Sequence, residues 1–515
     1  MKKGKVYLIG AGPGDPGLFT LKGKKCLEKA DVIVYDLLVN QKIINFSRKE
    51  TEILYVGKKS GHHEISQNVI NKILIDRAKK GKIVVRLKGG DPFIFGRGGE
   101  EAEVLSTHGI DFEVVPGVPS PSSVPAYAGI PLTHRKLSSS FTVITGHKDT
   151  GQATREHPWE ALAKLGTIVI LMGVGKVEQN LRKLIENGKS PKTPVAIISW
   201  GTLPKQQTVT GTLETISDLA RKKGVKPPGV IVVGDVVKLR EKILWFEKKP
   251  LFGKRILVTR PKEQSESFVN LLEDLGAEVI VFPTIEISPP KEWGSLDRAI
   301  ERLNRYDWII FTSANGVRFF LYRLKTVGRD LRELKGIKIV AIGEQTAKAV
   351  EKHDLRIEMI PSDFRAEGII EAFSNVDLKN NCILIPRARI ARDLLPNELR
   401  KRGAEVDVVT AYETKKPRLK HISNIKGMFR LGLIDIVTFT SSSTVRNFMA
   451  IFGNDKDLLK KSTIACIGPV TASTAKAIGI KPQIVCKKYT IEEMTREIVD
   501  YYKYKKSRNA KVSNK

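Results

Sequence analysis

Short hydrophobic runs recur along the chain, each separated from the next by a mixed polar and apolar segment of helix length. Most runs are continuous rather than alternating, which is typical of strands buried on both faces of a parallel sheet. Connectors of this length cross from one parallel strand to the next. The sequence therefore predicts an α/β protein with parallel sheets covered on both faces. The strand-like runs lie at residues 6–10, 31–36, 82–87, 141–146, 167–173, 255–261, 308–314, 337–343, 382–388, 436–442 and 462–468.

Chain length and one interrupted segment predict the division into domains. A chain of 515 residues is too long for a single core. After a charged helical stretch, Pro250 and Gly253 interrupt the pattern before a new strand begins. We therefore expect two halves, 1–247 and 255–500, joined by a linker at 248–254.

Two short motifs each occur twice in the second half. FTSANGV at 311–317 is echoed by FTSSSTV at 439–445, and GEQTA at 343–347 is echoed by GPVTA at 468–472. Each copy puts hydroxyls where a strand ends and a helix begins, which predicts two similar α/β domains facing one cleft. The hydroxyls would either line a shared anion-binding surface or only cap the following helices. They belong to Thr312, Ser313, Thr346, Thr440, Ser441, Ser442 and Thr471.

Composition and charge favour an ordinary globular protein. The chain is 41% apolar and 28% charged, and no apolar run approaches the ~18 residues of a membrane span. The net charge of +31 is evenly spread, with 40 Lys and Arg against 24 Asp and Glu in residues 1–250 and 47 against 32 in residues 251–515. Without a nucleic-acid-binding motif, this spread favours a solvated surface or a polyanionic small substrate. Only residues 501–515 look like a disordered basic extension.

The cysteines and the N-terminus bear on the compartment. Four scattered cysteines form neither a disulfide framework nor a metal-binding pair. The first apolar run is short and enters a glycine turn, which is typical of a first strand rather than a signal peptide. We therefore expect a cytoplasmic protein with no membrane segment and no metal site.

The loop GPGDPG at residues 12–17 has the glycine spacing of a dinucleotide-binding turn. Such a turn holds pyrophosphate with backbone N–H groups. Pro13 and Pro16 each remove one of those donors, and Asp15 places a negative charge where a phosphate would lie. The sequence therefore predicts a loop for a ligand without phosphates, and a plain tight turn is the alternative.

Two further segments add candidate binding residues. In KGGDPFIFGRGGEE, residues 88–101, Gly89 and Gly90 let the backbone approach a ligand closely, and Asp91 could accept hydrogen bonds from a ribose or an amine. The proline-rich stretch 114–135 predicts a connection that joins two subdomains across a cleft.

With these motifs, residues 3–247 resemble uroporphyrinogen-III C-methyltransferase, a member of the tetrapyrrole methylase family. The resemblance implies two subdomains, about 1–117 and 118–247, and a homodimer formed through this half. It also implies that S-adenosylmethionine methylates uroporphyrinogen III at C2 and C7 to give precorrin-2, for sirohaem or cobalamin. That cofactor carries a sulfonium and no phosphate, in agreement with the proline-interrupted loop. The segments that carry the resemblance are VYLIGAGPGDPGLFTLKG, VYDLLV, VVRLKGGDPFIFGRGGEE, AYAGIPLTHR, FTVITGH and VVGDVVKLREKILWF.

The resemblance assigns roles to individual residues of the first half. Asp36 matches the proposed proton acceptor of the family and Lys58 its proposed donor, with a helix cap and a surface charge as the respective alternatives. The segment VPSPSS at 118–123 departs from the family, which usually has Thr-Ala or Thr-Ser-Ala after VPG. The implied cofactor contacts are Pro13, Gly89, Gly90, Asp91, Ile94, Pro119, Ser120, Met172 and Gly201.

Basic residues of the first half are candidates for binding the acetate and propionate groups of the substrate, because guanidinium forks suit carboxylates. The same residues could equally form structural ion pairs. They are Arg97, His134, Arg135 and Lys136.

Residues 253–500 resemble uroporphyrinogen-III synthase in the order of several weak motifs. The resemblance implies two flavodoxin-like domains, one discontinuous at about 255–284 and 413–500, the other inserted at about 285–412. It implies closure of hydroxymethylbilane with inversion of the last ring and loss of water, without a cofactor. The duplicated hydroxyls and Arg387 would bind substrate carboxylates. Tyr412 matches the tyrosine proposed to assist loss of hydroxide, and a buried structural tyrosine is its alternative.

The sequence therefore predicts a bifunctional enzyme of tetrapyrrole biosynthesis that acts on hydroxymethylbilane and uroporphyrinogen III. A different tetrapyrrole methylase fused to the synthase is the alternative within this class. A basic nucleic-acid-binding protein is the alternative from another class, and the even charge spread disfavours it.

Overall fold

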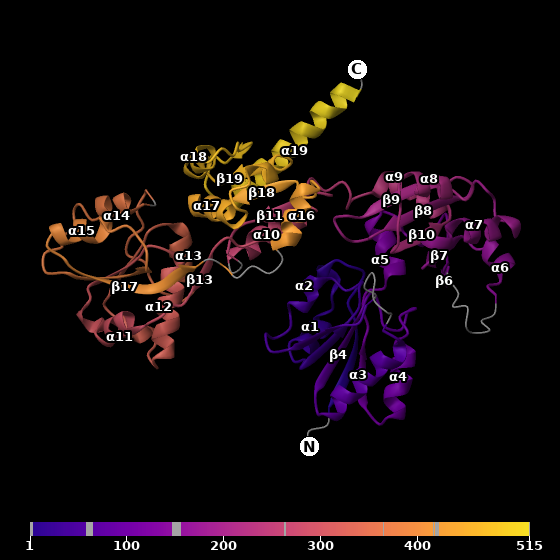
Figure 1. The fold of residues 1–515 in the computed structure, drawn as a ribbon, viewed down its shortest axis with the longest axis horizontal. Helices are drawn as coiled ribbons and strands as arrows, with labels where there is room; N and C mark the ends of the chain where they lie inside the picture. Colours follow the sequence, from indigo (N-terminus) through magenta and orange to yellow (C-terminus); the bar gives the residue numbers. More distant parts are fainter. Residues whose placement is uncertain are drawn as a thin grey trace. The chain divides into compact units, whose positions relative to one another are not determined.

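The computed structural model describes residues 4–57, 65–146, 156–261, 264–363, 365–415, 417 and 422–513. The chain divides into two compact units, and each carries two five-stranded sheets (Figure 1). The first unit comprises Met1–Arg255, Leu271–Glu278 and Val499–Lys515, and the second comprises Ile256–Asn270 and Val279–Ile498.

The first sheet of the first unit is entirely parallel, in the order β3-β2-β4-β1-β5. Helices α1 and α2 cover one face of this sheet, and α3 and α4 cover the other (Figure 1). The strands are β1 (Lys5–Gly10), β2 (Val32–Tyr35), β3 (Glu52–Tyr55), β4 (Ile83–Lys88) and β5 (Asp111–Val115). The helices are α1 (Leu21–Leu27), α2 (Gln41–Ile44), α3 (Gln67–Lys79) and α4 (Gly98–Thr107).

Alternation along β4 decides which side chains meet which helices. Val85 and Leu87 pack into the core under α1 and α2, whereas Val84 packs into the core under α3 and α4. Side chains two residues apart share a face of a strand. Arg86 and Lys88 therefore point to the same side as Val84, toward α3 and α4.

The second sheet of the first unit is mixed, in the order β6-β7-β10-β8-β9. Only β6 and β7 run parallel, whereas β10 is antiparallel to both β7 and β8, and β8 is antiparallel to β9. The prediction of parallel sheets was wrong for this part, because buried runs read alike in both kinds of sheet. The strands are β6 (Phe141–Thr145), β7 (Thr167–Leu171), β8 (Pro194–Ser199), β9 (Gln207–Thr212) and β10 (Gly229–Val233). Around them lie α5 (Ser120–Tyr127), α6 (Trp159–Ala163), α7 (Val177–Glu186), α8 (Ile216–Lys222) and α9 (Arg240–Ile243).

One sheet of the second unit has the order β12-β11-β18-β19-β20. The chain leaves this sheet after β12 and returns to it at β18, and the resulting order 2-1-3-4-5 is that of flavodoxin-like folds. Five phenylalanines, at 282, 429, 439, 448 and 452, pack together in its core. The strands are β11 (Arg255–Val258), β12 (Glu278–Val281), β18 (Ile436–Phe439), β19 (Thr463–Cys466) and β20 (Ile484–Val485). The helices are α10 (Glu266–Asp274), α16 (Ile422–Arg430), α17 (Ser442–Ile451), α18 (Pro469–Ala477) and α19 (Ile491–Ser513).

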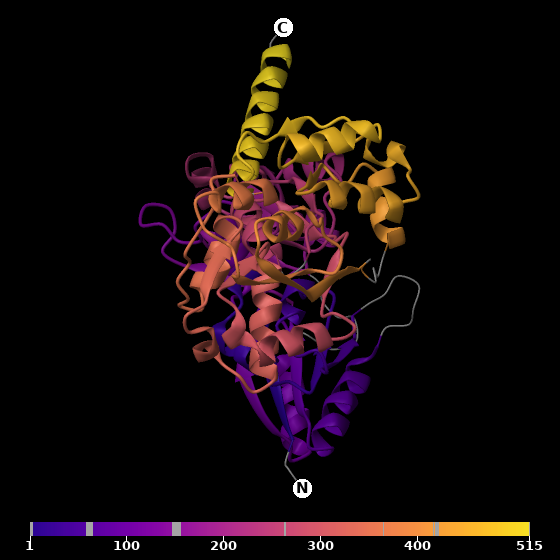
Figure 2. The same cartoon turned by 90° about the vertical axis from the view of Figure 1, so that its left-hand side faces the viewer.

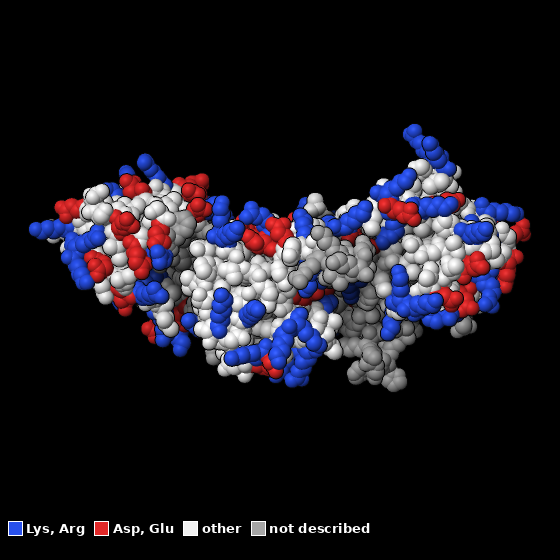
Figure 3. Space-filling model, turned by 90° about the horizontal axis from the view of Figure 1, so that it is seen from above, with Lys and Arg blue, Asp and Glu red and all other residues white. Residues whose placement is uncertain are grey.

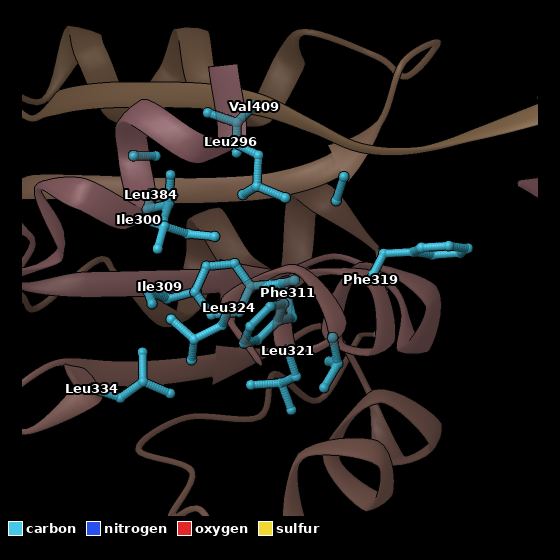
Figure 4. Close-up of a cluster of buried hydrophobic side chains, with 14 of the residues drawn as sticks. Leu296, Ile300, Ile309, Phe311, Phe319, Leu321, Leu324, Leu334, Leu384 and Val409 are labelled. Atoms are coloured by element: carbon cyan, nitrogen blue, oxygen red, sulfur yellow. The ribbon is translucent and has the colours of Figure 1, made fainter. Parts of the chain in front are cut away.

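The other sheet of the second unit lies between these two segments of chain, in the order β13-β17-β16-β14-β15. All its pairings are parallel except that of β13 with β17. Figure 4 shows its core, where Leu324 of α12 packs beside Ile309 and Phe311 of β14. The strands are β13 (Glu286–Ser288), β14 (Trp308–Phe311), β15 (Lys338–Ala341), β16 (Cys382–Ala388) and β17 (Glu405–Lys415). The helices are α11 (Gly294–Glu301), α12 (Ala314–Thr326), α13 (Glu344–Glu351), α14 (Ala366–Ala372) and α15 (Leu394–Lys401).

Every hydrophobic run that predicted a strand forms one. The C-terminal tail differs from the expectation. We expected disorder in residues 501–515, but α19 continues as one helix from Ile491 to Ser513 (Figures 1 and 2). Its first turns bury apolar side chains, among them Met494 and Ile498, and a helix begun this way propagates at little cost. Among the described helices, none is both long and apolar enough to cross a membrane.

Truncation of a core leucine should destabilise the second unit. Leu324 is 1% exposed, so Leu324→Ala should lower the free energy of unfolding by about 2–5 kcal/mol through lost burial and a residual cavity. Leu431 is 74% exposed, and Leu431→Ala is the matched control, with a change of about 0.5 kcal/mol or less. Urea unfolding followed by tryptophan fluorescence measures both. Equal losses for the two variants would contradict the packing described for α12.

Candidate functional site

A cavity of about 840 Å³ lies in the first unit, lined from both of its sheets. The loop after β1 contributes Gly12 and Pro13, and the carboxyl end of β4 contributes Lys88, Gly89 and Gly90. The other sheet supplies residues that follow β7 and β8, together with the start of β10. Carboxyl ends of strands in open α/β sheets are the usual place for small ligands.

Most N–H groups of the loop at residues 12–17 already have hydrogen-bond partners. The Gly12 N–H donates to the Gly90 carbonyl at 3.1 Å, and the Gly17 N–H donates to the Asp15 carboxylate at 2.8 Å. The Asp15 N–H donates to the Thr202 hydroxyl at 3.0 Å, and Asp15 also accepts from the Tyr127 hydroxyl at 2.8 Å. Pro13 and Pro16 have no N–H. The loop therefore lacks the row of free donors that a pyrophosphate needs, and Asp15 serves to tie it to Tyr127 and Thr202.

Three glycines let the loops beneath the cavity touch. A Cβ on Gly10 would lie 2.5 Å from the Gly117 Cα, and a Cβ on Gly117 would lie 2.3 Å from the Gly90 carbonyl oxygen. Gly90 also has φ +68°, a left-handed conformation that favours glycine. Asp91 fixes the same junction, because its carboxylate accepts from the N–H groups of Phe93 at 2.8 Å and Gly117 at 3.0 Å. Both oxygens of Asp91 thus bind backbone.

Bulky residues in a left-handed conformation gather at this cavity. Phe95, Arg97, Met172 and Trp200 line it and have φ between +51° and +59°. Each such residue costs about 1–3 kcal/mol, and this strain concentrates at functional sites. In the described part of the chain, the other non-glycine residues with positive φ are Thr202, next to the site, and Asp354, Asn380 and Asn454. Aspartate and asparagine tolerate this conformation.

Asp36 lies in the cavity wall after β2, with its side chain 28% exposed. Its Oδ1 accepts from the Leu38 N–H at 3.2 Å, and its Oδ2 lies 3.6 Å from Nη2 of Arg86. Asn40, not Asp36, caps α2. The carboxylate is thus oriented by one backbone N–H and one guanidinium, and it faces a space large enough for a ligand.

A buried charge cluster that the sequence analysis missed lies behind Asp36. Glu101 of α4 is fully buried, and its Oε1 accepts from Arg86 Nε at 3.1 Å, Lys88 Nζ at 3.0 Å and Gln67 Nε2 at 3.1 Å. Arg86, Lys88 and Gln67 all line the cavity. Burial and the neighbouring Arg86 lower the pKa of Lys88. The sequence did contain a signal for this cluster, because the otherwise apolar strand VVRLK carries two cations at alternate positions.

The structure brings most of the expected cofactor contacts to the cavity. Two do not line it: Asp91 fixes the glycine junction, and Pro119 precedes α5, where its carbonyl accepts from Ser122 and Ser123. Pro119 lacks the hydroxyl of the threonine that the family usually has in this segment, but its carbonyl still organises the turn. The expected contacts that line the cavity are Pro13, Gly89, Gly90, Ile94, Ser120, Met172 and Gly201.

The basic residues expected to bind substrate separate into two groups. Arg97 lines the cavity and pairs with Glu100 at 2.7 Å. His134, Arg135 and Lys136 do not line it and lie in a turn closed by hydrogen bonds between His134 and Ser138. Lys58 lies outside the described residues.

In the second unit, the duplicated hydroxyls lie at the strand ends of two sheets. Ser313 caps α12 by accepting from the Gly316 N–H at 3.1 Å, and Ser441 caps α17 in a capping box with Thr444. Helix capping, one of the two expected roles, is therefore what these two side chains do in the structure. The others are Thr312 after β14, Thr346 buried in α13, Thr440 after β18, Ser442 at the start of α17 and Thr471 buried in α18.

Tyr412 and Arg387 lie on adjoining strands of the second unit. Tyr412 of β17 is 8% exposed, its ring stacks on Phe319 and its hydroxyl is 3.0 Å from the Ser313 hydroxyl. Arg387 of β16 donates to the Arg392 carbonyl at 2.7 Å and pairs with Asp393. The tyrosine thus places its hydroxyl at a duplicated turn, whereas Arg387 fixes the loop after β16.

The fold and the cavity define an α/β protein with a ligand-sized cavity in its first half, followed by two flavodoxin-like domains. Family models agree with this division: Tetrapyrrole (Corrin/Porphyrin) Methylases matches residues 5–217, and Uroporphyrinogen-III synthase HemD matches residues 266–496. The chain is 41% identical to the "Porphyrin biosynthesis protein HemD" of Ruminiclostridium josui over 97% of this chain and 98% of that protein. The chain therefore belongs to the family that joins a tetrapyrrole methylase to a uroporphyrinogen-III synthase, and it is an enzyme of tetrapyrrole biosynthesis.

Two further comparisons concern the first half alone. A "S-adenosyl-L-methionine-dependent uroporphyrinogen III methyltransferase" of Methanosarcina barkeri is 53% identical over 46% of this chain and 94% of that protein. The crystal structure of a uroporphyrin-III C-methyl transferase from Thermus thermophilus, complexed with S-adenyl homocysteine, matches at 39% identity and a TM-score of 0.40. It covers 46% of this chain and 99% of that one.

On the face shown in Figure 3, Lys and Arg are scattered among Asp and Glu rather than joined in one continuous basic stripe. A stripe of that kind is the usual footprint of nucleic-acid binding.

Proposed function

We propose that the first half transfers methyl groups from S-adenosylmethionine to C2 and C7 of uroporphyrinogen III to give precorrin-2. The second half would supply that substrate by closing hydroxymethylbilane with inversion of the last ring and loss of water. The observation that carries the proposal is the cavity with Asp36 in its wall, in a chain of this family.

The residues of the cavity fit S-adenosylmethionine better than a dinucleotide. Three N–H groups of the loop at 12–17, those of Gly12, Asp15 and Gly17, already have partners. A Cβ on Gly90 would come no closer than 3.7 Å to the Ser120 nitrogen, so the backbone there is open toward the cavity. Ile94, Met172 and Leu203 add apolar lining, and apolar lining with a few placed polar groups is typical of such sites. When bound, this cofactor supplies the methyl group.

Asp36 has the chemistry that methylation of a pyrrole carbon requires. A pyrrole that gains a methyl group becomes cationic and must then lose a proton. A carboxylate fixed by the Leu38 N–H and by Arg86 stabilises that charge and can accept the proton. Arg97, in the same cavity, is suited to a substrate carboxylate.

For the second half, the task is to hold a flexible polycarboxylate in one conformation. Ring closure to the wrong isomer needs no enzyme, so positioning is the main contribution. The hydroxyl of Tyr412, beside Ser313 at the amino end of α12, is suited to assist the departure of hydroxide. The homodimer, the lack of a cofactor in this half and the subdomain limits stay expectations from resemblance. The cytoplasmic location and the boundary near residue 250 stay expectations from the cysteines and from the sequence pattern.

The first prediction concerns ligand choice. Isothermal titration calorimetry of the full chain should show binding of S-adenosylhomocysteine and none of NAD, because the N–H groups of Gly12, Asp15 and Gly17 are already bonded and Pro13 and Pro16 have none. Tight NAD binding without S-adenosylhomocysteine binding would refute the assignment of the first half.

The second prediction tests Asp36. Asp36→Asn keeps the size of the side chain but removes the charge, so methylation of uroporphyrinogen III should slow roughly 10²–10³-fold. Conversion of hydroxymethylbilane to uroporphyrinogen III should be unchanged, and absorption spectra distinguish the products. Asp76→Asn, at an exposed position of α3, is the matched control. An Asp36→Asn protein that methylates at the normal rate would show that the carboxylate has no role in the reaction.

The third prediction tests Tyr412. Tyr412→Phe removes only the hydroxyl, so formation of the III isomer should slow roughly 10²-fold while methylation of supplied uroporphyrinogen III continues. Chromatographic separation of the I and III isomers measures the effect. Tyr322→Phe, 57% exposed on α12, controls for the substitution itself. If isomer ratio and rate stay normal in Tyr412→Phe, the tyrosine serves only the packing against Phe319.

A further inference from the structure

Glu101 is a buried carboxylate that no step of the proposed reaction uses. It is fully buried at the first helical turn of α4, yet it touches three side chains that line the cavity. All three bonds go to one oxygen, and the other, Oε2, is buried with no hydrogen-bond partner in the described part of the chain. Burying a carboxylate with an unpartnered oxygen costs stability, so its presence points to a role other than stabilising the fold.

Glu101 fixes the plane of the Arg86 guanidinium. Nε of Arg86 donates to Glu101, and Nη1 donates to the carbonyls of Val34 at 3.4 Å and Leu87 at 3.2 Å. A guanidinium is planar, so fixing Nε and Nη1 also fixes the direction of Nη2. Nη2 is the atom that lies 3.6 Å from Oδ2 of Asp36.

Glu101 also balances the charge next to the cavity. Two cations, Arg86 and Lys88, lie against it, with side chains 4% and 5% exposed. Burial and Arg86 lower the pKa of Lys88, whereas Glu101 raises it and so favours the ammonium form. Without the carboxylate, two buried cations would face each other, and Arg86 would turn toward the nearest remaining anion, Asp36.

We propose that Glu101 is a positioning residue, which acts through Arg86 to hold the Asp36 carboxylate in its reactive orientation without touching the substrate. The inference rests on the proposed methylase function of the same cavity. In this proposal, Arg86 in the VVRLK strand and Glu101 in GRGGEE share one task. Together they hold the guanidinium group rigid behind the carboxylate of Asp36.

Glu101→Gln tests the proposal in the full chain. The amide keeps the shape and one acceptor oxygen but removes the charge, so the kcat for methylation of uroporphyrinogen III should fall about 10²-fold. The KM for S-adenosylmethionine and the affinity for S-adenosylhomocysteine should stay within a factor of about two, because Glu101 does not line the cavity. Glu103→Gln, exposed on the same helix, is the matched control and should have normal kinetics.

A double-mutant cycle separates positioning from a general structural effect. In an Asp36→Asn background, Glu101→Gln should change kcat by only about two-fold, because the residue that it positions is already inactive. Independent effects that multiply in the double variant would overturn the proposal, and so would a normal kcat in a folded Glu101→Gln protein.

A second substitution covers the case in which Glu101→Gln does not fold. Arg86→Lys keeps the charge, but a lysine has no planar guanidinium with which to contact Glu101 and Asp36 in a fixed geometry. This variant should therefore lower kcat without raising the KM for S-adenosylmethionine. A normal kcat for Arg86→Lys would also refute the proposal. Failure of the proposed function looks different, because the unsubstituted chain would then neither bind S-adenosylhomocysteine nor methylate uroporphyrinogen III.

Discussion

The close contact of three glycines beneath the cavity is the constraint on which the first half depends. Gly10 ends β1, Gly90 follows β4 and Gly117 follows β5, and a Cβ on Gly10 or Gly117 would clash where the three backbones meet. This contact brings the ends of three parallel strands close enough for the Gly12 and Gly90 peptides to bond reciprocally. The N–H groups of Gly12, Asp15 and Gly17 in the proline-glycine loop then have partners, which suits the proposed ligand without phosphates.

A second constraint is the alternation of side chains along β4. The same strand that buries Val85 and Leu87 against α1 and α2 must present Arg86 and Lys88 to α3 and α4. An apolar partner on α4 would take from Lys88 its ion-pair partner and leave Arg86 with Asp36 alone, and Glu101 meets both cations instead. The register of β4 therefore determines both the packing of the sheet and the chemistry of the site. Shifting β4 by one residue would move Arg86 and Lys88 to the face that now carries Val85 and Leu87.

The two halves are related through the proposed chemistry. The product of the second half would be the substrate of the first, and both would handle the same set of carboxylates around a ring. The second half holds its hydroxyls at helix starts, where Ser313 and Ser441 cap α12 and α17. The first half instead has a fixed carboxylate in the cavity wall, Asp36, which suits the positive charge that the proposed methylation would develop.

The sequence alone predicted the family and eleven of the strands that the structure forms. Buried strands are continuous apolar runs, and glycine and proline mark their ends, so these features are readable locally. The residues Pro13, Gly89, Gly90, Ile94 and Met172 were expected at the site and line the cavity, because they lie in loops whose motifs are local.

Only the tertiary structure decided the partners of charged groups. That Arg86 and Lys88 meet Glu101, that Asp91 binds the backbone of Gly117 and that His134 lies outside the cavity wall depend on segments far apart in the chain. The mixed order of the second sheet depends on strand direction, which a buried apolar run does not record. An ion pair or a strand direction depends on two segments at once. The hydrophobic pattern of one segment predicts only which of its own residues are buried.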